Sequence, residues 1–159
     1  MSSAIYPGSF DPVTNGHMSI IKAGLVVFDE VTVAVLGNPK KTSLFTVDER
    51  MAMIREAIGD EKRIKVDCFE GLLVEYCRRK EARAVLRGLR AVADFEYELQ
   101  MANMNRHLNE QVETVFLMAN DAYFYVSSNI VKEAATLGGD VSALVPASVN
   151  RELKSKLGR

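Results

Sequence analysis

The chain has 159 residues, of which 48% are hydrophobic and 26% charged, and its 20 basic and 21 acidic side chains leave a formal net charge of −1. This length suits one domain, residues 1–159, with a full core, and the balanced charge argues against nucleic-acid binding through a broadly basic face. Because the sequence has neither an apolar run of about 18 residues nor a charged-then-apolar leader, we expect a cytoplasmic protein without a membrane partner.

Short apolar runs alternate with longer amphipathic patterns, as in parallel βαβ units. Five strands are predicted, at Ala4–Tyr6, Val31–Leu36, Ile64–Phe69, Ala84–Leu86 and Thr114–Met118. The first predicted helix carries Ile20, Ile21, Gly24, Leu25 and Phe28 on one side. Further helices are predicted from a capping box at Thr46 and Glu49, from Leu72 to about Lys80, over Asp94–Leu108 and Ser128–Thr136, and after Pro146. We therefore expect an α/β, Rossmann-like, doubly wound sheet of five parallel strands, with its ligand outside their carboxyl ends where the strand order reverses.

A Gly/Pro-rich turn, Tyr6 to His17, joins the first strand to the first helix. Glycines let a ligand approach the backbone, and the free N–H groups at the start of a helix attract anions. We expect Gly16 and His17 in the first helical turn, the imidazole on the same anion as those N–H groups, and the Ser9 hydroxyl on the strand side. The alternative is an ordinary corner with a capping histidine.

Three further groups of polar residues follow predicted strands. They are Lys40-Lys41, Arg87-Gly88-Leu89-Arg90 and Ser127-Ser128-Asn129. Arginine grips phosphate oxygens through a planar fork of donors, and hydroxyl and N–H groups at a helix start can cradle phosphates. The alternatives are solvated lysines, salt bridges from the arginines to Asp94, Glu96 or Glu98, and plain N-capping.

This set of residues has many phosphate binders but no Walker A pattern, no paired catalytic carboxylates and no Cys/His nucleophile arrangement. Cys68 and Cys77 are expected to be reduced core or half-buried residues. The pattern favours phosphoryl or nucleotidyl transfer by positioning and charge stabilisation, with an ionised substrate phosphate as its own nucleophile.

Thr14-Asn15-Gly16-His17 resembles the (His/Thr)-x-Gly-His signature of the nucleotidylyltransferases, and Tyr6–His17 as a whole is similar to the phosphopantetheine adenylyltransferase family. The similarity continues through Lys41, Gly71–Leu73, Arg87–Glu98, Met104–Arg106 and Ser127–Glu133. The four-residue signature indicates only the superfamily, whereas Arg87–Glu98 narrows the resemblance to this family.

The resemblance implies transfer of AMP from Mg-ATP to 4'-phosphopantetheine, giving dephospho-coenzyme A and pyrophosphate. The catalytic residues that it implies are His17, Lys41 and Arg90. For ATP it implies Ser9, Phe10, His17, Gly88, Leu89, Arg90, Glu98, Tyr123, Phe124, Tyr125, Val126, Ser127, Ser128 and Asn129. For phosphopantetheine it implies Ser9, Lys41, Leu73 and Arg87.

The resemblance also implies Mg²⁺ carried by ATP without a protein metal site, a homohexamer, and coenzyme A as a feedback inhibitor. The apolar side chains of the predicted long helix cover more than one face, which favours an interface there. Two other hypotheses stay open: a sister nucleotidylyltransferase that uses nicotinamide mononucleotide or a cytidylyl donor, and a catalytically silent nucleotide-binding regulatory module.

Overall fold

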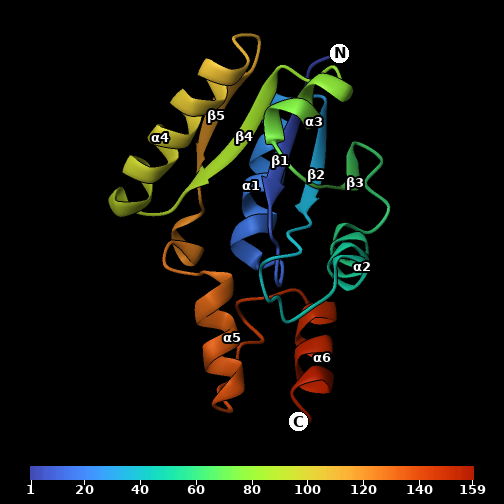
Figure 1. Cartoon of the computed structure of the whole chain (residues 1–159). Helices are drawn as coiled ribbons and strands as arrows, with labels where there is room; N and C mark the ends of the chain where they lie inside the picture. Colours follow the sequence, from blue (N-terminus) through green and yellow to red (C-terminus); the bar gives the residue numbers. More distant parts are fainter.

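The computed structural model describes residues 1–159, which form one five-stranded parallel sheet with the order β3-β2-β1-β4-β5 (Figure 1). The strands are β1 (Ser3–Gly8), β2 (Glu30–Leu36), β3 (Ile64–Phe69), β4 (Ala84–Leu89) and β5 (Glu113–Met118). The helices are α1 (Asn15–Val27), α2 (Val47–Ile58), α3 (Leu73–Arg79), α4 (Val92–Leu108), α5 (Ser128–Thr136) and α6 (Ala147–Lys156). The predicted doubly wound, Rossmann-like sheet is confirmed, and its strand order reverses between β1 and β4.

Local sequence signals account for the start of α2 and the end of α5. At the start of α2, Thr46 Oγ1 accepts a hydrogen bond from the Glu49 N–H (3.2 Å), and Glu49 Oε2 accepts one from the Thr46 N–H (2.8 Å). This reciprocal pair satisfies two N–H groups that the helix leaves free. The chain leaves α5 through Gly138, whose positive φ of 88° suits glycine.

Alternate residues of the inner strands point into two separate cores. Val31, Val33 and Val35 of β2 belong to a cluster of 22 buried residues, whereas Ala34 belongs to one of 8. The larger cluster includes side chains from α1, α2, α5 and α6, and the smaller one lies under α3. The sheet face covered by α3 and α4 is therefore the more thinly packed of the two.

Strand β4 is longer than predicted. Its pairing with β5 continues to Leu89, which lies opposite Met118, so Arg87, Gly88 and Leu89 are strand residues and only Arg90 follows the strand. The sequence predicts an end of this strand at Leu86 because Arg87 and Gly88 interrupt the apolar run. Their backbone pairing with β5 nevertheless extends the strand, and the expectation of a loop at Arg87–Leu89 is corrected.

Three smaller features also differ from the predictions. Helix α4 begins at Val92, two residues before the expected start, and a short 3₁₀ helix, η1 (Asp121–Tyr123), precedes α5. Cys77 is buried as expected, but Cys68 is exposed, because its side chain leaves the sheet on the side away from Phe69, which is buried.

Helices α5 and α6 lie beyond the arrowheads of the strands (Figure 1), so the carboxyl end of the sheet faces the start of α5. Helix α4 runs along β4 and the edge strand β5. None of the helices is both long enough and apolar enough to span a membrane.

Candidate active site

An open cavity of about 630 Å³ lies over the carboxyl ends of β1 and β4, where the strand order reverses. Its walls come from β1, the loop after it, α1, the loop with Lys41, β4, α4 and the start of α5. The predicted site residues that line it are Ser9, Phe10, His17, Lys41, Arg87, Gly88, Arg90, Glu98, Val126, Ser128 and Asn129. The fold thus gathers in one cleft residues that are up to 120 positions apart in the sequence.

His17 is built into the start of α1. Thr14 is the N-cap, its Oγ1 accepts from the His17 N–H (3.3 Å), and its own N–H donates to Nδ1 of His17 (3.0 Å). Because a backbone N–H can only donate, Nδ1 must be the unprotonated nitrogen, and the neutral ring carries its proton on Nε2. The prediction that Gly16 and His17 lie in the first helical turn is confirmed, and the capping role named as the alternative is also present.

The surroundings of His17 keep its imidazole neutral. Burial lowers its pKa most, and the positive charges of Arg90 and Arg87 lower it further, to about 3. The Phe10 ring packs edge-on against the imidazole, with 4.9 Å between the ring centroids. At neutral pH His17 is therefore an uncharged hydrogen-bond donor through Nε2, and it holds no second proton to give as an acid.

Phe10 lies in the loop after β1, and its ring is buried, so it offers no exposed aromatic face to a ligand. Only 2% of its surface is exposed, and its backbone has a positive φ of 48°, which non-glycine residues adopt infrequently. Its ring contacts Tyr6 and His17. The contribution that Phe10 can offer to a ligand is its backbone and its support of His17.

Arg87 is held by protein groups on two sides. Its Nε and Nη2 donate to the two carboxylate oxygens of Glu98, with 2.8 Å from Nε to Oε2, and Nη1 donates to the Pro7 carbonyl oxygen (2.8 Å). Burial lowers the pKa of Arg87, but Glu98 raises it more, so the guanidinium stays charged. The salt-bridge alternative for Arg87 is thus realised, and Glu98, predicted to bind ATP, orients Arg87.

Arg90 joins the two sides of the cleft. Its Nη1 donates to the Val126 carbonyl oxygen (2.7 Å), while its Nε lies 3.5 Å from an Asp94 carboxylate oxygen. Arg90, which follows β4, thus binds the backbone of Val126, two residues before α5 begins. The Arg90 guanidinium keeps free N–H groups beside His17 and the start of α5.

A second groove of about 400 Å³ contains Leu73. It shares Ser9, Arg87 and Glu98 with the main cleft, and its far wall carries Leu72, Phe69 and Met101. One continuous depression therefore runs from the helix start that carries His17, past Arg87, to the apolar groove that contains Leu73. This groove is called the apolar channel below.

The remaining predicted site residues do not line the main cleft: Leu89, Tyr123, Phe124, Tyr125 and Ser127. Tyr125 is 80% exposed, and Tyr123 lies against α1 at Gly16. Ser127 is the N-cap of α5, since its Oγ accepts from the Ile130 N–H (3.1 Å), which matches the capping alternative. That these residues bind ATP stays a prediction.

Sequence reasoning missed several residues of the site. Thr14 and Tyr97 line the cleft, and Asp11 lies buried within the loop that follows β1. For Thr14 the signal was present, because Thr three positions before a polar residue at a helix start indicates a cap. The partners of Asp11 are 33 to 121 positions away, so no local pattern indicates them.

A model of the cytidylyltransferase-like family matches residues 5–134. Proteins named phosphopantetheine adenylyltransferase are similar over nearly the whole chain. The one from Anaeromyxobacter sp. (strain K) is 57% identical over 157 residues, which cover 99% of this chain and 96% of the relative. For Desulfosudis oleivorans the identity is 56% over 158 residues, with 99% and 94% covered. For Alkaliphilus metalliredigens it is 54% over 156 residues, with 98% and 99% covered.

Proposed function

This chain belongs to the phosphopantetheine adenylyltransferase family, and we propose that it transfers the adenylyl group of ATP to 4'-phosphopantetheine, giving dephospho-coenzyme A and pyrophosphate. The observation that carries the proposal is the continuous depression over β1 and β4, with a neutral imidazole and two arginines at one end and an apolar channel at the other. A nucleoside triphosphate suits the first part, and a phosphate on a flexible amide-containing arm suits the second.

In the proposed reaction an oxygen of the acceptor phosphate forms a bond to the α-phosphorus of ATP while the bond from this phosphorus to the β-phosphate oxygen breaks. A phosphate monoester has its second pKa at about 6, so at neutral pH its attacking oxygen is already ionised. No general base is needed, which agrees with a cleft whose only imidazole is neutral and already accepts a hydrogen bond at Nδ1. The protein's task is to position two anions and to stabilise the charge that develops between them.

We assign the roles from the geometry. His17 donates from Nε2 to the α-phosphate oxygen as negative charge grows there, and the helix start beside it adds N–H groups. Arg90 and the start of α5 attract the outer phosphates of ATP. Arg87, aligned by Glu98 and Pro7, and Lys41, exposed on the opposite rim, attract the acceptor phosphate, whose arm lies along Leu73.

Mg²⁺ enters this proposal as part of the substrate Mg-ATP. The structure holds no group of three or more His, Cys, Asp or Glu side chains arranged to bind a metal, and the Asp94 and Glu98 carboxylates of the cleft face arginines. Triphosphate oxygens and water commonly hold Mg²⁺ in such sites. The ion screens the phosphate charges while the protein residues bind their outer oxygens.

A pyrophosphate-release assay tests the proposed function. ATP is supplied with 4'-phosphopantetheine in one arm and with nicotinamide mononucleotide in the other, and CTP replaces ATP in a third. We expect release with ATP and 4'-phosphopantetheine alone. Release with another pair would identify a sister nucleotidylyltransferase, and nucleotide binding without any release would identify a silent module.

We further propose that the protein is a cytoplasmic homohexamer in which α4 forms an interface. We also propose that coenzyme A inhibits the enzyme by occupying the apolar channel. The support is the exposed apolar surface of α4, where Phe95, Leu99, Met101, Met104 and Leu108 are each 40–53% exposed over the thinner core. Such a surface favours burial by another subunit. Light scattering that finds a monomer at micromolar concentration would refute the assembly, and coenzyme A that leaves pyrophosphate release unchanged would refute the inhibition.

A further inference from the structure

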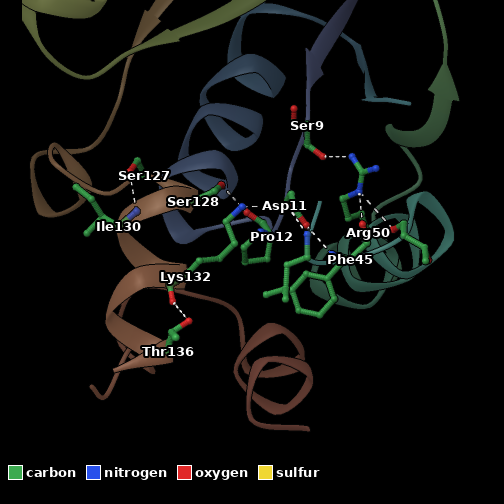
Figure 2. Close-up of polar contacts among 12 residues, drawn as sticks. Ser9, Asp11, Pro12, Phe45, Arg50, Ser127, Ser128, Ile130, Lys132 and Thr136 are labelled. Carbon is green, nitrogen blue, oxygen red and sulfur yellow. Dashed lines mark hydrogen bonds and ion pairs between the residues drawn. The ribbon is translucent and has the colours of Figure 1, made fainter. Parts of the chain in front are cut away.

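We propose that Asp11 is a positioning residue that holds three ligand-binding segments of the cleft in register, an inference that rests on the proposed function. Asp11 is only 5% exposed and lies in the loop after β1. It does not line the cleft, so its effect on the reaction passes through the groups that it holds. Figure 2 shows its carboxylate between the loop that contains Phe45 and the side chain of Lys132.

The Asp11 carboxylate accepts three hydrogen bonds from two distant parts of the chain. Oδ1 accepts from the Phe45 N–H (2.9 Å), and Oδ2 accepts from the Leu44 N–H (2.9 Å) and from Nζ of Lys132 (3.0 Å). Burial raises the pKa of Asp11, but the Phe45 and Leu44 N–H groups and the Lys132 ammonium lower it more, and the net result is a lowered pKa. The group is therefore ionised at neutral pH and can accept from all three donors.

Each of the three segments also carries a candidate ligand-binding group. Asp11 directly follows Ser9 and Phe10, and its loop leads into His17. Leu44 lies three residues after Lys41, in the same loop between β2 and α2. Lys132 lies one turn after Ser128 in α5. One buried carboxylate thus connects the α-phosphate side, the acceptor-phosphate side and the outer-phosphate side of the cleft.

Two further contacts secure the same loop (Figure 2). Ser128 Oγ donates to the Pro12 carbonyl oxygen (2.7 Å), which is a second tie from α5. Nη1 of Arg50, a buried residue of α2, donates to the Ser9 carbonyl oxygen (2.7 Å). Nε of Arg50 also donates to the Phe45 carbonyl oxygen (3.1 Å), so Arg50 is a second link from this loop to the Phe45 segment. The N–H groups of Leu44 and Phe45 are bound by the Asp11 carboxylate, and Arg50, which only donates, cannot take over these two bonds.

The chain offers a matched control in Asp67 of β3. Asp67 also accepts three hydrogen bonds, from the Cys68 N–H (2.9 Å), the Tyr76 hydroxyl (2.9 Å) and Nζ of Lys80 (2.7 Å). Its pKa is likewise lowered, although burial alone would raise it. Neither Asp67 nor Lys80 lines the proposed cleft.

The test compares Asp11→Asn, Lys132→Met, their double variant, Lys132→Arg, and Asp67→Asn as control, by pyrophosphate release with ATP and 4'-phosphopantetheine. Asparagine has one acceptor oxygen in place of two, so it must lose the bond from Phe45 or those from Leu44 and Lys132. We expect Asp11→Asn to raise KM for both substrates and to lower kcat/KM about 100-fold, the order expected from a misplacement of about 1 Å.

Lys132→Met removes the bond from Lys132 of α5 to Asp11 and leaves the bonds from Leu44 and Phe45 and the tie from Ser128 to Pro12. We expect it to raise KM for ATP while KM for 4'-phosphopantetheine stays unchanged, and Lys132→Arg to restore KM for ATP. The double variant should be no worse than Asp11→Asn, because the pair acts as a unit. Effects of Asp11→Asn and Lys132→Met that simply add would overturn the proposal, because Lys132 would then act on ATP without Asp11.

Two more outcomes separate this inference from the proposed function. A wild-type protein that releases no pyrophosphate refutes the function, and calorimetric ATP binding by the same variants then decides the role of Asp11. An active wild type with Asp11→Asn indistinguishable from Asp67→Asn refutes positioning. If Asp11→Asn does not fold, the Lys132→Met and Lys132→Arg pair decides, since a KM for ATP that is unchanged in Lys132→Met contradicts the proposed tie.

Discussion

Replacing His17 with alanine removes the ring donor that we place on the α-phosphate. The N–H from Thr14 to Nδ1 leaves the proton on Nε2, and the pKa of about 3 keeps the ring neutral, so the loss concerns one uncharged hydrogen bond to a developing charge. Loss of one such donor costs about 2.7–4 kcal/mol in the transition state, or roughly 100- to 1,000-fold in rate. We expect kcat to fall by this factor while the dissociation constant for ATP changes little.

The same residue predicts how stability depends on pH. The unfolded chain protonates His17 below its ordinary value of 6.5, whereas the folded chain protonates it only near 3. Stability from this group is therefore complete above pH 6.5 and is lost as the pH falls toward 3. At about 1.4 kcal/mol per pKa unit, the fall from 6.5 to about 3 corresponds to about 5 kcal/mol as an upper figure.

Single-turnover kinetics measure the effect of His17→Ala on kcat. Urea unfolding between pH 4 and 8 measures how the stability depends on pH. His17→Ala should remove the part of the acid-induced loss that this histidine causes, whereas His107→Ala, which replaces the other histidine of the chain, should retain it. A His17→Ala variant with near-normal kcat would refute the assigned role. A pKa near 6.5 measured for the His17 imidazole by NMR in the folded protein would refute the neutral donor.

Three other outcomes are expected. Lys41→Ala and Arg87→Ala should chiefly raise KM for 4'-phosphopantetheine, whereas Arg90→Ala should chiefly raise KM for ATP. If calorimetry showed an equal loss of ATP affinity in all three variants, the division of the cleft into two subsites would be wrong. Excess chelator should abolish pyrophosphate release, and added Mg²⁺ should restore it; full activity in chelator would contradict Mg-ATP as the substrate. Gly24→Ala would place a Cβ 2.7 Å from Leu86 Cδ2, so urea unfolding should show a loss of about 1–3 kcal/mol, and unchanged stability would mean that this part of the core can rearrange.

Much of the fold could be predicted because it depends on neighbouring residues. The capping box at Thr46 and the helical turn at His17 are signals within four positions, and the alternation of strands and helices indicates the parallel sheet. The cleft followed from the rule that ligands bind at the carboxyl ends of such strands where their order reverses. The polar residues named for it lie mostly there.

The remainder depends on contacts between distant residues. Arg87 is polar and precedes a glycine, which is typical of a loop, yet its position opposite Phe116 of β5 keeps it in the strand. Sequence alone left its ligand and salt-bridge alternatives open, because Glu98 becomes its partner only when α4 packs beside β4. Asp11 gave no signal, since its bonds form only after β2, α2 and α5 are in place.

The hydrogen bond from the Thr14 N–H to Nδ1 of His17 also makes a backbone amide a reporter of the imidazole. A proton that binds to Nδ1 removes its lone pair, so this bond breaks and the first turn of α1 loses one of its two capping bonds. Hydrogen–deuterium exchange at this single amide should therefore accelerate relative to its neighbours as the solution is acidified. Protonation of the imidazole thus becomes measurable in the free protein, without nucleotide and without turnover.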